Sequence, residues 1–368
     1  MPGAALDSVL GAVLALGLAV APWVVQAQGQ EDVLKDWRQA NEAVGQFPRG
    51  HADVLRWEQS QAPKATTAQS PVPGFELPSA ADAVRAAWAV QRELATPLAQ
   101  LGQPAVEHIA AGGWAMVDPS LQRRIHGVDK LLDMAATTRK AWIMAVAARQ
   151  TVQHLQAALT AAEAGAELGR RMVSVGNWSR YQQAQVALGE STARLDLRRA
   201  RLATQQAEWV LLKSMGLDTI HERVALPDRL PNVPTSTISE SELQQRLGAI
   251  QSHLPVAQSR KASGNAQQAY AAYTASLEVH RSYREDVLKQ RELIGEETLL
   301  RYNGMLESVW GLLADVGARS QAVVAAIGAQ RDALIAEADL QWVLHGGRPD
   351  AFVSLGAGAA TAAAAPGH

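Results

Sequence analysis

Apolar residues recur at helical spacing over most of this chain. From about Leu121 to Ser174 the pattern continues without a proline or a cluster of turn residues, far beyond the length of an average globular helix. The larger apolar and small residues of this stretch step by three and four, as in a coiled-coil seam. The seam consists of Val152, Leu155, Leu159, Ala162 and Ala166.

A second long helix is predicted from Ser179 to Met215, closing at Gly216. It carries two seven-residue repeats, turned roughly 160° from each other round the helix. One repeat is Leu188, Leu195, Leu202 and Trp209; the other is Val186, Ala193, Ala200 and Ala207. A helix with two apolar seams needs neighbours on both sides, as in a curved wall of helices.

Shorter signals place the remaining helices. Ser79 with Asp82 has the spacing of a capping box and predicts a helix that ends near Leu101, where Gly102 stops it. Ser239 with Glu242 begins another helix, which His253-Leu254-Pro255 interrupts, and a further helix is predicted from Gln258 to about Tyr302. The last long helix ends at Gly346 and repeats its apolar residues at Val309, Val316, Val323, Ile327 and Leu334.

The two halves of the chain match each other at an offset of about 130 residues, which indicates an internal repeat. Each half has a long helix, a glycine-containing turn followed by serine, and a long return helix that stops at glycine. We therefore predict an all-α fold of two long antiparallel coiled-coil hairpins. The predicted segments are a signal peptide (1–27), short N-terminal helices (28–58), a linker (59–78), the first hairpin (79–217), a Pro-rich linker (218–238), the second hairpin (239–347) and a disordered tail (348–368).

Composition narrows the function. The first 27 residues combine an apolar run with the ending Val25-Gln26-Ala27, which predicts export. No later segment is expected to cross a membrane unaided. The absence of cysteine excludes disulfides, thiol catalysis and thiolate metal sites, and a net charge of -2 argues against nucleic acid as a partner. No catalytic motif or cofactor motif appears, so we expect neither an enzyme nor a bound cofactor.

The repeated helical order resembles the TolC-type outer-membrane efflux proteins of Gram-negative bacteria. The residues that carry the resemblance are Val175-Gly176 with Ser179, Arg301 to Leu306, and Ala338-Asp339-Leu340 with the Gly346-Gly347 ending. The stretches Asp36 to Asn41 and Arg49 to Asp53 look like the leader of a branch associated with metal resistance.

The resemblance implies a homotrimer that forms a periplasmic helical conduit for small solutes or metal ions and docks an inner-membrane adaptor. It places adaptor-docking positions at the hairpin tips: Val175, Gly176, Trp178, Ser179, Gly304, Met305 and Ser308. The alternating strands of a membrane β-barrel are not recognisable, since Gln103–Ser120 is too short and Val256–Tyr283 is helical in pattern. The alternative is a barrel-less periplasmic scaffold that binds an adaptor without conducting solute. The localisation is accordingly exported, in the periplasm or the cell outer membrane.

Isolated polar and aromatic residues have simpler interpretations. His51 and Asp53 fit a solvated turn better than a metal site, and we expect no metal site elsewhere. Trp142 and Trp209 fall on seams and are expected in the core, whereas Trp178 at a tip is a candidate for partner contact. The basic group at Arg194, Arg198, Arg199 and Arg201 predicts a solvated helix face.

Overall fold

A computed structural model of the chain describes residues 74–114, 124–234, 238–251 and 256–354, which belong to one compact unit that starts at Pro73. The predicted signal peptide and N-terminal helices, with His51, Asp53 and most of the first linker, lie outside the described residues.

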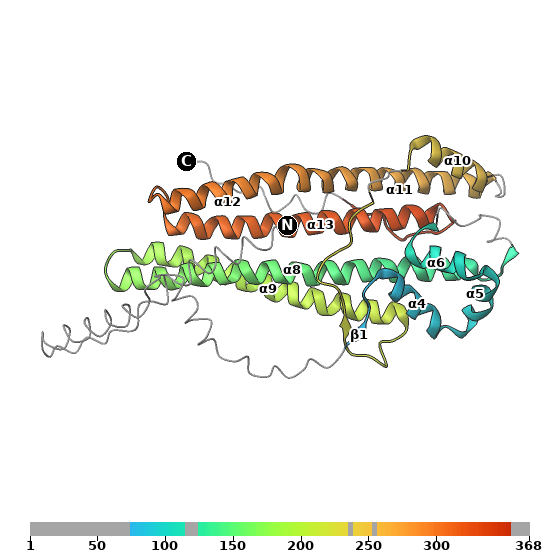
Figure 1. Ribbon diagram of the computed structural model, residues 1–368, viewed down its shortest axis with the longest axis horizontal. Helices are drawn as coiled ribbons and strands as arrows, with labels where there is room; N and C mark the ends of the chain where they lie inside the picture. Colours follow the sequence, from blue (N-terminus) through green and yellow to red (C-terminus); the bar gives the residue numbers. More distant parts are fainter. Residues whose placement is uncertain (1–73, 115–123, 235–237, 252–255, 355–368) are drawn as a thin grey trace, which may run out of the picture. The chain divides into compact units, whose positions relative to one another are not determined.

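The first hairpin consists of α8 (Val128–Ser174) and α9 (Arg180–Met215), which run side by side (Figure 1). Ser179 caps α9 in a capping box with Gln182, and Gly216 ends it at φ 70°, as the sequence predicts. α8 begins later than predicted. Gly127 takes a left-handed conformation (φ 90°) directly before it, so a helix from Leu121 could not continue through that residue.

The second hairpin consists of α11 (Val256–Ser282), a π turn η3 (Tyr283–Val287) and α12 (Leu288–Asn303), followed by the return helix α13 (Val309–Val343). A shorter helix, α10 (Glu240–Gln251), precedes it. Ser308 caps α13 by accepting a hydrogen bond from the Gly311 backbone N–H at 3.2 Å. The two return helices, α9 with 36 residues and α13 with 35, are nearly equal in length, in agreement with the internal repeat.

The π turn keeps one face of the continuous helical segment from α11 through α12 against α13. The inward positions step by three and four residues on either side of the turn and by five across it. A single extra residue is thereby absorbed without rotating the following seam away from its partner. The inward positions are Ala266, Ala269, Tyr273, Ser276, His280 and Tyr283 before the step of five, and Leu288, Arg291, Gly295, Thr298 and Tyr302 after it.

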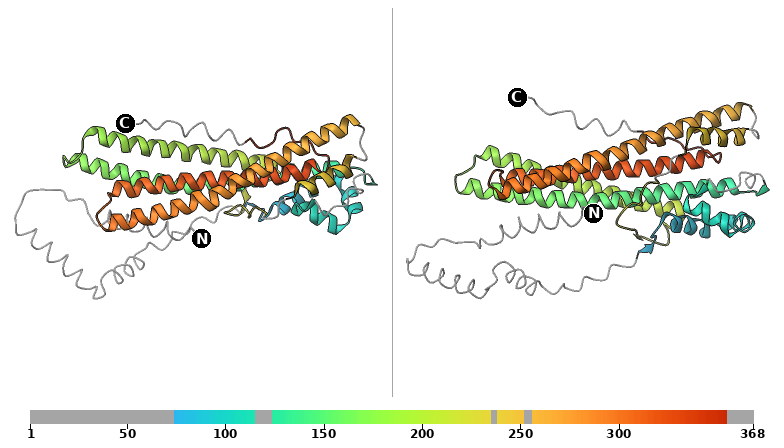
Figure 2. Two further views of the ribbon diagram at one scale, coloured as in Figure 1. Left: turned by 90° about the horizontal axis from the view of Figure 1, so that it is seen from above. Right: turned by 45° about the horizontal axis from the view of Figure 1, so that its top comes forward.

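The two hairpins meet through their inner helices. α8 packs on both α9 and α13, and α13 packs on α8, α11 and α12, so the lateral order is α9, α8, α13 and then α11 with α12 (Figures 1 and 2). The predicted seam of α13 is confirmed, since Val316, Ile327 and Leu334 are buried. Trp142 is buried as predicted, and its Nε1 donates to the Leu77 carbonyl at 3.1 Å.

At the end away from the tips the predicted helix from Ser79 to Leu101 is broken. It is divided into α4 (Ala80–Val90), a 3₁₀ turn η1 (Arg92–Leu94) and α5 (Ala95–Leu101). The capping box of Ser79 and Asp82 is confirmed. The break runs from Gln91 through η1. Pro97 in the first turn of α5 lacks the N–H that would bond to the Glu93 carbonyl in a continuous helix, which favours a break in this region. A further helix, α6 (Gln103–Ala111), lies in a stretch for which the sequence shows no clear period.

The predicted linkers pack more than expected. Two short strands, β1 (Phe75–Glu76) and β2 (Val224–Ala225), pair in parallel and fasten both linkers to the bundle. In the predicted tail, Phe352 and Val353 pack on the core, and only residues from 355 onward lie outside the described residues. Apolar side chains explain these contacts: Leu77, Val224, Leu226, Leu230 and Val233 are all buried.

The described residues therefore form a helical body with only two short strands, which confirms the predicted fold class of paired helical hairpins. One described helix, α13, is long and apolar enough to cross a membrane by length and composition, with a mean hydropathy of 1.2 in its most apolar window. This property of α13 was not predicted from the sequence.

Candidate docking surfaces at the hairpin tips and edges

The first tip is a Schellman turn that ends α8. Asn177 N–H donates to the Met172 carbonyl at 2.9 Å and Gly176 N–H donates to the Val173 carbonyl at 3.0 Å. Gly176 holds the left-handed position at φ 78°, which a residue with a Cβ adopts only with strain. Val175 and Ser179 are exposed beside it. The predicted residues of this tip thus lie together at one turn.

The second tip has the same hydrogen bonds, but its left-handed residue is a methionine. Leu306 N–H donates to the Arg301 carbonyl at 2.8 Å and Met305 N–H donates to the Tyr302 carbonyl at 3.0 Å. Met305 has φ 59° and is 93% exposed, whereas Gly304 has an ordinary φ of -81°. The structural counterpart of Gly176 is therefore Met305, although the sequence shows a glycine in each turn.

A pair of tryptophans joins the two tips. Trp178 in the first turn stacks on Trp310 at the start of α13, with ring centroids 4.2 Å apart and planes inclined by 30°. Glycines on α8 make room for this pair. A side chain added at Gly169 would meet Val186 at 2.8 Å and Trp178 at 3.3 Å, and one at Gly165 would meet Leu313 at 3.5 Å. Trp178, predicted as a partner contact, thus first contacts its own chain, although it stays partly exposed.

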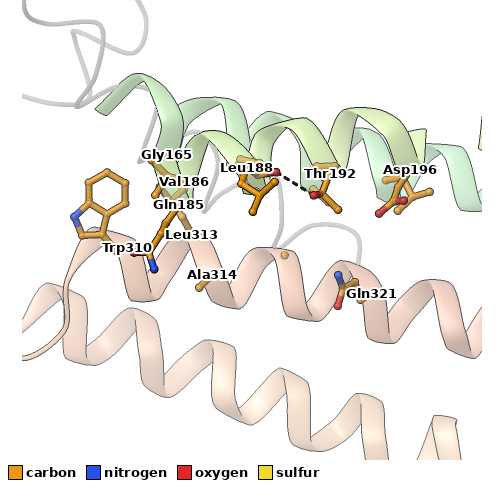
Figure 3. A pocket seen from close by; sticks show the side chains of 17 residues that line it. Gly165, Gln185, Val186, Leu188, Thr192, Asp196, Trp310, Leu313, Ala314 and Gln321 are labelled. Carbon is orange, nitrogen blue, oxygen red and sulfur yellow. Dashed lines mark hydrogen bonds between the residues drawn. The ribbon is translucent and has the colours of Figure 1, made fainter. Parts of the chain in front are cut away.

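An open groove of about 600 Å³ runs from this tryptophan pair between the first hairpin and α13. Figure 3 shows Leu188, Thr192 and Asp196 of α9 along one wall, opposite Ala314 and Gln321 of α13. Small side chains line much of the groove, so the backbone of a docked helix could approach closely. The small lining residues are Ala158, Ala161, Ala162, Gly165, Gly189, Ala193, Ala314 and Gly317.

The outer edge of the first hairpin carries an exposed apolar stripe on α9. It contains the predicted Leu188 repeat and extends it by one step at the tip end. These side chains are 50 to 72% exposed, whereas the second seam of α9 is partly buried toward α8. The prediction that Trp209 lies in the core is therefore wrong, because no helix of the described chain covers this face. The α9 stripe is Tyr181, Leu188, Leu195, Leu202 and Trp209.

The opposite edge carries a second exposed apolar stripe, on α12 and the end of the π turn. Its spacing is also seven, in two neighbouring rows. These residues point away from α13 because the inward seam occupies the other face of the helix. The α12 stripe consists of Val287 with Ile294 and Leu293 with Leu300.

The two edges differ in charge. α9 contains six Lys and Arg residues and three Asp and Glu residues, whereas η3 with α12 contains four and five. The predicted basic group is exposed, and Arg194 pairs with Glu190 and with Glu163 of α8. Near the first tip, hydrogen bonds from Arg171 and Arg170 lower the pKa of Glu167. Such exposed pairs stabilise little and leave the edge open to other charges.

The described residues contain no group of three or more His, Asp or Glu side chains placed to hold a metal ion. The polar contacts of the interior instead connect helices. Lys140 of α8 donates to Asp339 of α13 at 2.7 Å and lies over the Trp342 ring, and Trp342 donates to Asp133 at 2.7 Å. These side chains fasten the inner helices to each other.

Neither a protein-family model nor a curated protein matches the sequence. Several solved structures are similar to the chain, including the following two. A membrane protein from Pseudomonas aeruginosa matches with a TM-score of 0.46 and 12% identity, covering 66% of this chain and 72% of that chain. The CmeC outer membrane channel of Campylobacter jejuni matches with a TM-score of 0.48 and 13% identity, covering 66% of this chain and 67% of that chain.

Proposed function

We propose that this chain is a component of a TolC-type efflux conduit in the periplasm or the cell outer membrane. Three copies stand side by side as a helical wall, and an adaptor protein docks at the hairpin tips. The conduit exports small solutes or, as the leader sequence favours, metal ions. It performs no chemistry itself and needs no cofactor.

The observation that carries this proposal is the pair of exposed apolar stripes on opposite edges of the bundle. A stripe at seven-residue spacing is the seam that a coiled coil buries against a partner helix. Among the described residues, neither the α9 stripe nor the α12 stripe has a partner helix. If α9 of one copy packs on α12 of the next, the contact joins two different surfaces, and a rotation that closes produces a ring.

Charge supports the same pairing. The excess of basic residues on α9 would face the slight excess of acidic residues on η3 with α12 of the next copy, which favours this contact over α9 on α9. Burying each leucine of a stripe contributes about 1.5 to 3 kcal/mol relative to leaving it exposed. Several such residues on each edge supply the main driving force for assembly.

The tips suit an adaptor because they combine exposed apolar side chains with a defined backbone. Met305 and Leu306 project at the second turn and Val175 at the first, all largely exposed. An adaptor that presents a helix would continue from these residues into the groove beside Trp310, where small side chains allow close packing. We therefore assign the docking role to Val175, Gly176, Trp178, Ser179, Gly304, Met305 and Ser308, together with the groove.

The oligomeric state of the purified mature chain tests the proposal. Light scattering after gel filtration should give a trimer, and the double variant Leu195→Glu with Leu202→Glu should give a monomer with unchanged helical circular dichroism. The matched control is Ala203→Glu, which adds a charge to the exposed face of α9 outside the stripe and should remain trimeric. A wild type that stays monomeric, or a trimer indifferent to the double variant, would overturn the side-by-side conduit.

Fractionation and binding separate the conduit from the scaffold alternative. A conduit is expected in the membrane fraction as a trimer. A monomer recovered in the soluble periplasm that still binds the adaptor through Met305 and the groove would establish the scaffold instead.

A further inference from the structure

A partly buried carboxylate with one enclosed oxygen lies where the two hairpins meet. Glu337 is on α13, between the buried Ala336 and Ala338; the residue itself is partly exposed, but its Oε2 is enclosed and accepts no hydrogen bond from the described residues. A buried charge without a partner is costly, and it becomes less costly when the group takes up a proton. The surroundings of Glu337 therefore disfavour its ionised form.

The basic residue whose charge acts on Glu337, Arg139, makes its hydrogen bond to a different group. Arg139 of α8 donates from Nη1 to the Ala111 carbonyl at the end of α6, at 2.9 Å, and its guanidinium lies over Gly112. No ion pair joins Arg139 to Glu337 among the described residues, although their charges act on each other. Burial raises the pKa of Glu337, and the charge of Arg139 opposes that shift without cancelling it.

The other helices packed on this part of α13 contribute few titratable groups. From α11 the buried Tyr273 faces Glu337, and burial together with that carboxylate raises its pKa. From α8 Lys140 faces Asp339, whose pKa burial also raises. From α10 Arg246 faces His345, and burial lowers the pKa of that histidine. Among these groups Glu337 is the acid without a hydrogen-bonding partner on Oε2, and Gln341 one turn along has an unpartnered oxygen as well.

We propose that Glu337 is a proton-sensitive coupling between the two hairpins, which tightens the seam between α8, α11 and α13 when it is protonated. The neutral acid removes the uncompensated charge from the seam and gains a donor, which a nearby acceptor such as the Gln341 side chain could use. The ionised form keeps the charge and loosens the seam.

The direction follows from linkage. A carboxyl whose folded pKa lies above its unfolded pKa contributes stability that is fully present below the unfolded value and is lost as the pH rises through the folded value. The seam should therefore be tighter at pH 5.5 than at pH 8. Asp339 acts in the same direction and His345 in the opposite one, so the effect of Glu337 must be taken as a difference between variants.

Hydrogen exchange of the full mature chain, corrected for the intrinsic effect of pH, measures this coupling. In the wild type the opening equilibrium constant of the amides in Ala333–Val343 should be about threefold to tenfold larger at pH 8 than at pH 5.5. Glu337→Gln, which mimics the neutral acid, should remove most of that ratio by protecting the segment at pH 8. The control Glu297→Gln, on the exposed face of α12, should keep the wild-type ratio.

Arg139→Met supplies an independent arm. Without the opposing charge the midpoint of the pH dependence should move to higher pH, a shift that loss of the Ala111 hydrogen bond alone does not produce. The proposal is overturned if Glu337→Gln keeps the wild-type ratio, or if the segment is better protected at pH 8 than at pH 5.5. It is likewise overturned if Arg139→Met leaves the midpoint in place.

Discussion

The two hairpins have the same architecture but form it with different residues. The first rises through one uninterrupted helix of 47 residues, whereas the second rises through two helices joined by a π turn. The first turn places glycine in the left-handed position and tryptophan before its capping serine; the second places methionine and glutamate there. Features that both hairpins share are those that the hairpin geometry requires. Features found in only one hairpin are not required by that geometry.

The largest expected contrast comes from single-residue deletions at equivalent places in the two ascending helices. Deleting Ala157 from α8 rotates everything toward the tip by about 100°. Leu159, Gly165 and Ala166 then leave their partners, which should cost roughly 3 kcal/mol or more. Deleting Asp286 instead converts the step of five into a step of four and leaves both seams in place. Urea unfolding of the two deletion variants measures the difference. Equal losses of stability would show that the π turn does not absorb an inserted residue.

Replacing Trp178 should cost more folding stability than replacing its counterpart in the second turn, Glu307. Trp178→Ala removes the stack on Trp310 and should lower the free energy of unfolding by about 2 kcal/mol, with faster hydrogen exchange at both tips. Glu307→Ala, the same change at the equivalent position, removes a hydrogen bond to the Ser308 N–H and should cost much less. If both variants lose the same stability, the tips are not joined by the aromatic pair.

The turn glycines should differ even though the sequence shows one in each turn. Gly176→Ala forces a Cβ into the left-handed region and should cost about 1 kcal/mol. Gly304→Ala should be close to neutral, since its φ is ordinary and the nearest atom to an added Cβ, the Leu300 carbonyl oxygen, lies at 3.4 Å. Thermal unfolding of both variants checks this order; a larger loss at Gly304 would contradict it.

The smallest expected change in folding stability is an increase, whereas the preceding variants lose stability or are neutral. Met305→Gly relieves the strain of a left-handed residue with a side chain and should stabilise the chain by about 0.5 kcal/mol, after the added flexibility of the unfolded chain is deducted. The same variant should bind the adaptor more weakly, because it removes the most exposed apolar side chain of the tips. Calorimetric unfolding measures the change in stability, and titration with the adaptor measures the change in binding. A variant that binds as well as the wild type would remove Met305 from the docking surface.

Local signals in the sequence were sufficient for much of the fold. The bounds of α9 follow from Ser179 and Gly216, and the seam of α13 from its seven-residue repeat. The break between α4 and α5 was missed because a helical pattern continues on both sides of it, and Pro97, which removes the hydrogen bond to the Glu93 carbonyl, lies inside the following helix.

The candidate site was harder to predict. The residues of both tips were identified, but the choice between Gly304 and Met305 depends on where α12 ends, to within one residue. The stack of Trp178 on Trp310 joins residues far apart in sequence and has no local signal. Periodicity identified the α9 stripe but could not tell whether the same chain covers it.

α8 and α13 form the centre of the bundle, so the stability of each half of the chain depends on the other half. Each half supplies one helix to the central pair, so a hairpin made alone would expose the face that the other half normally covers. The repeat is visible in the sequence, but the core is shared between the two halves, so we expect neither hairpin to fold alone. A chain cut within the linker near Asn232 should therefore regain its structure only when both fragments are present together.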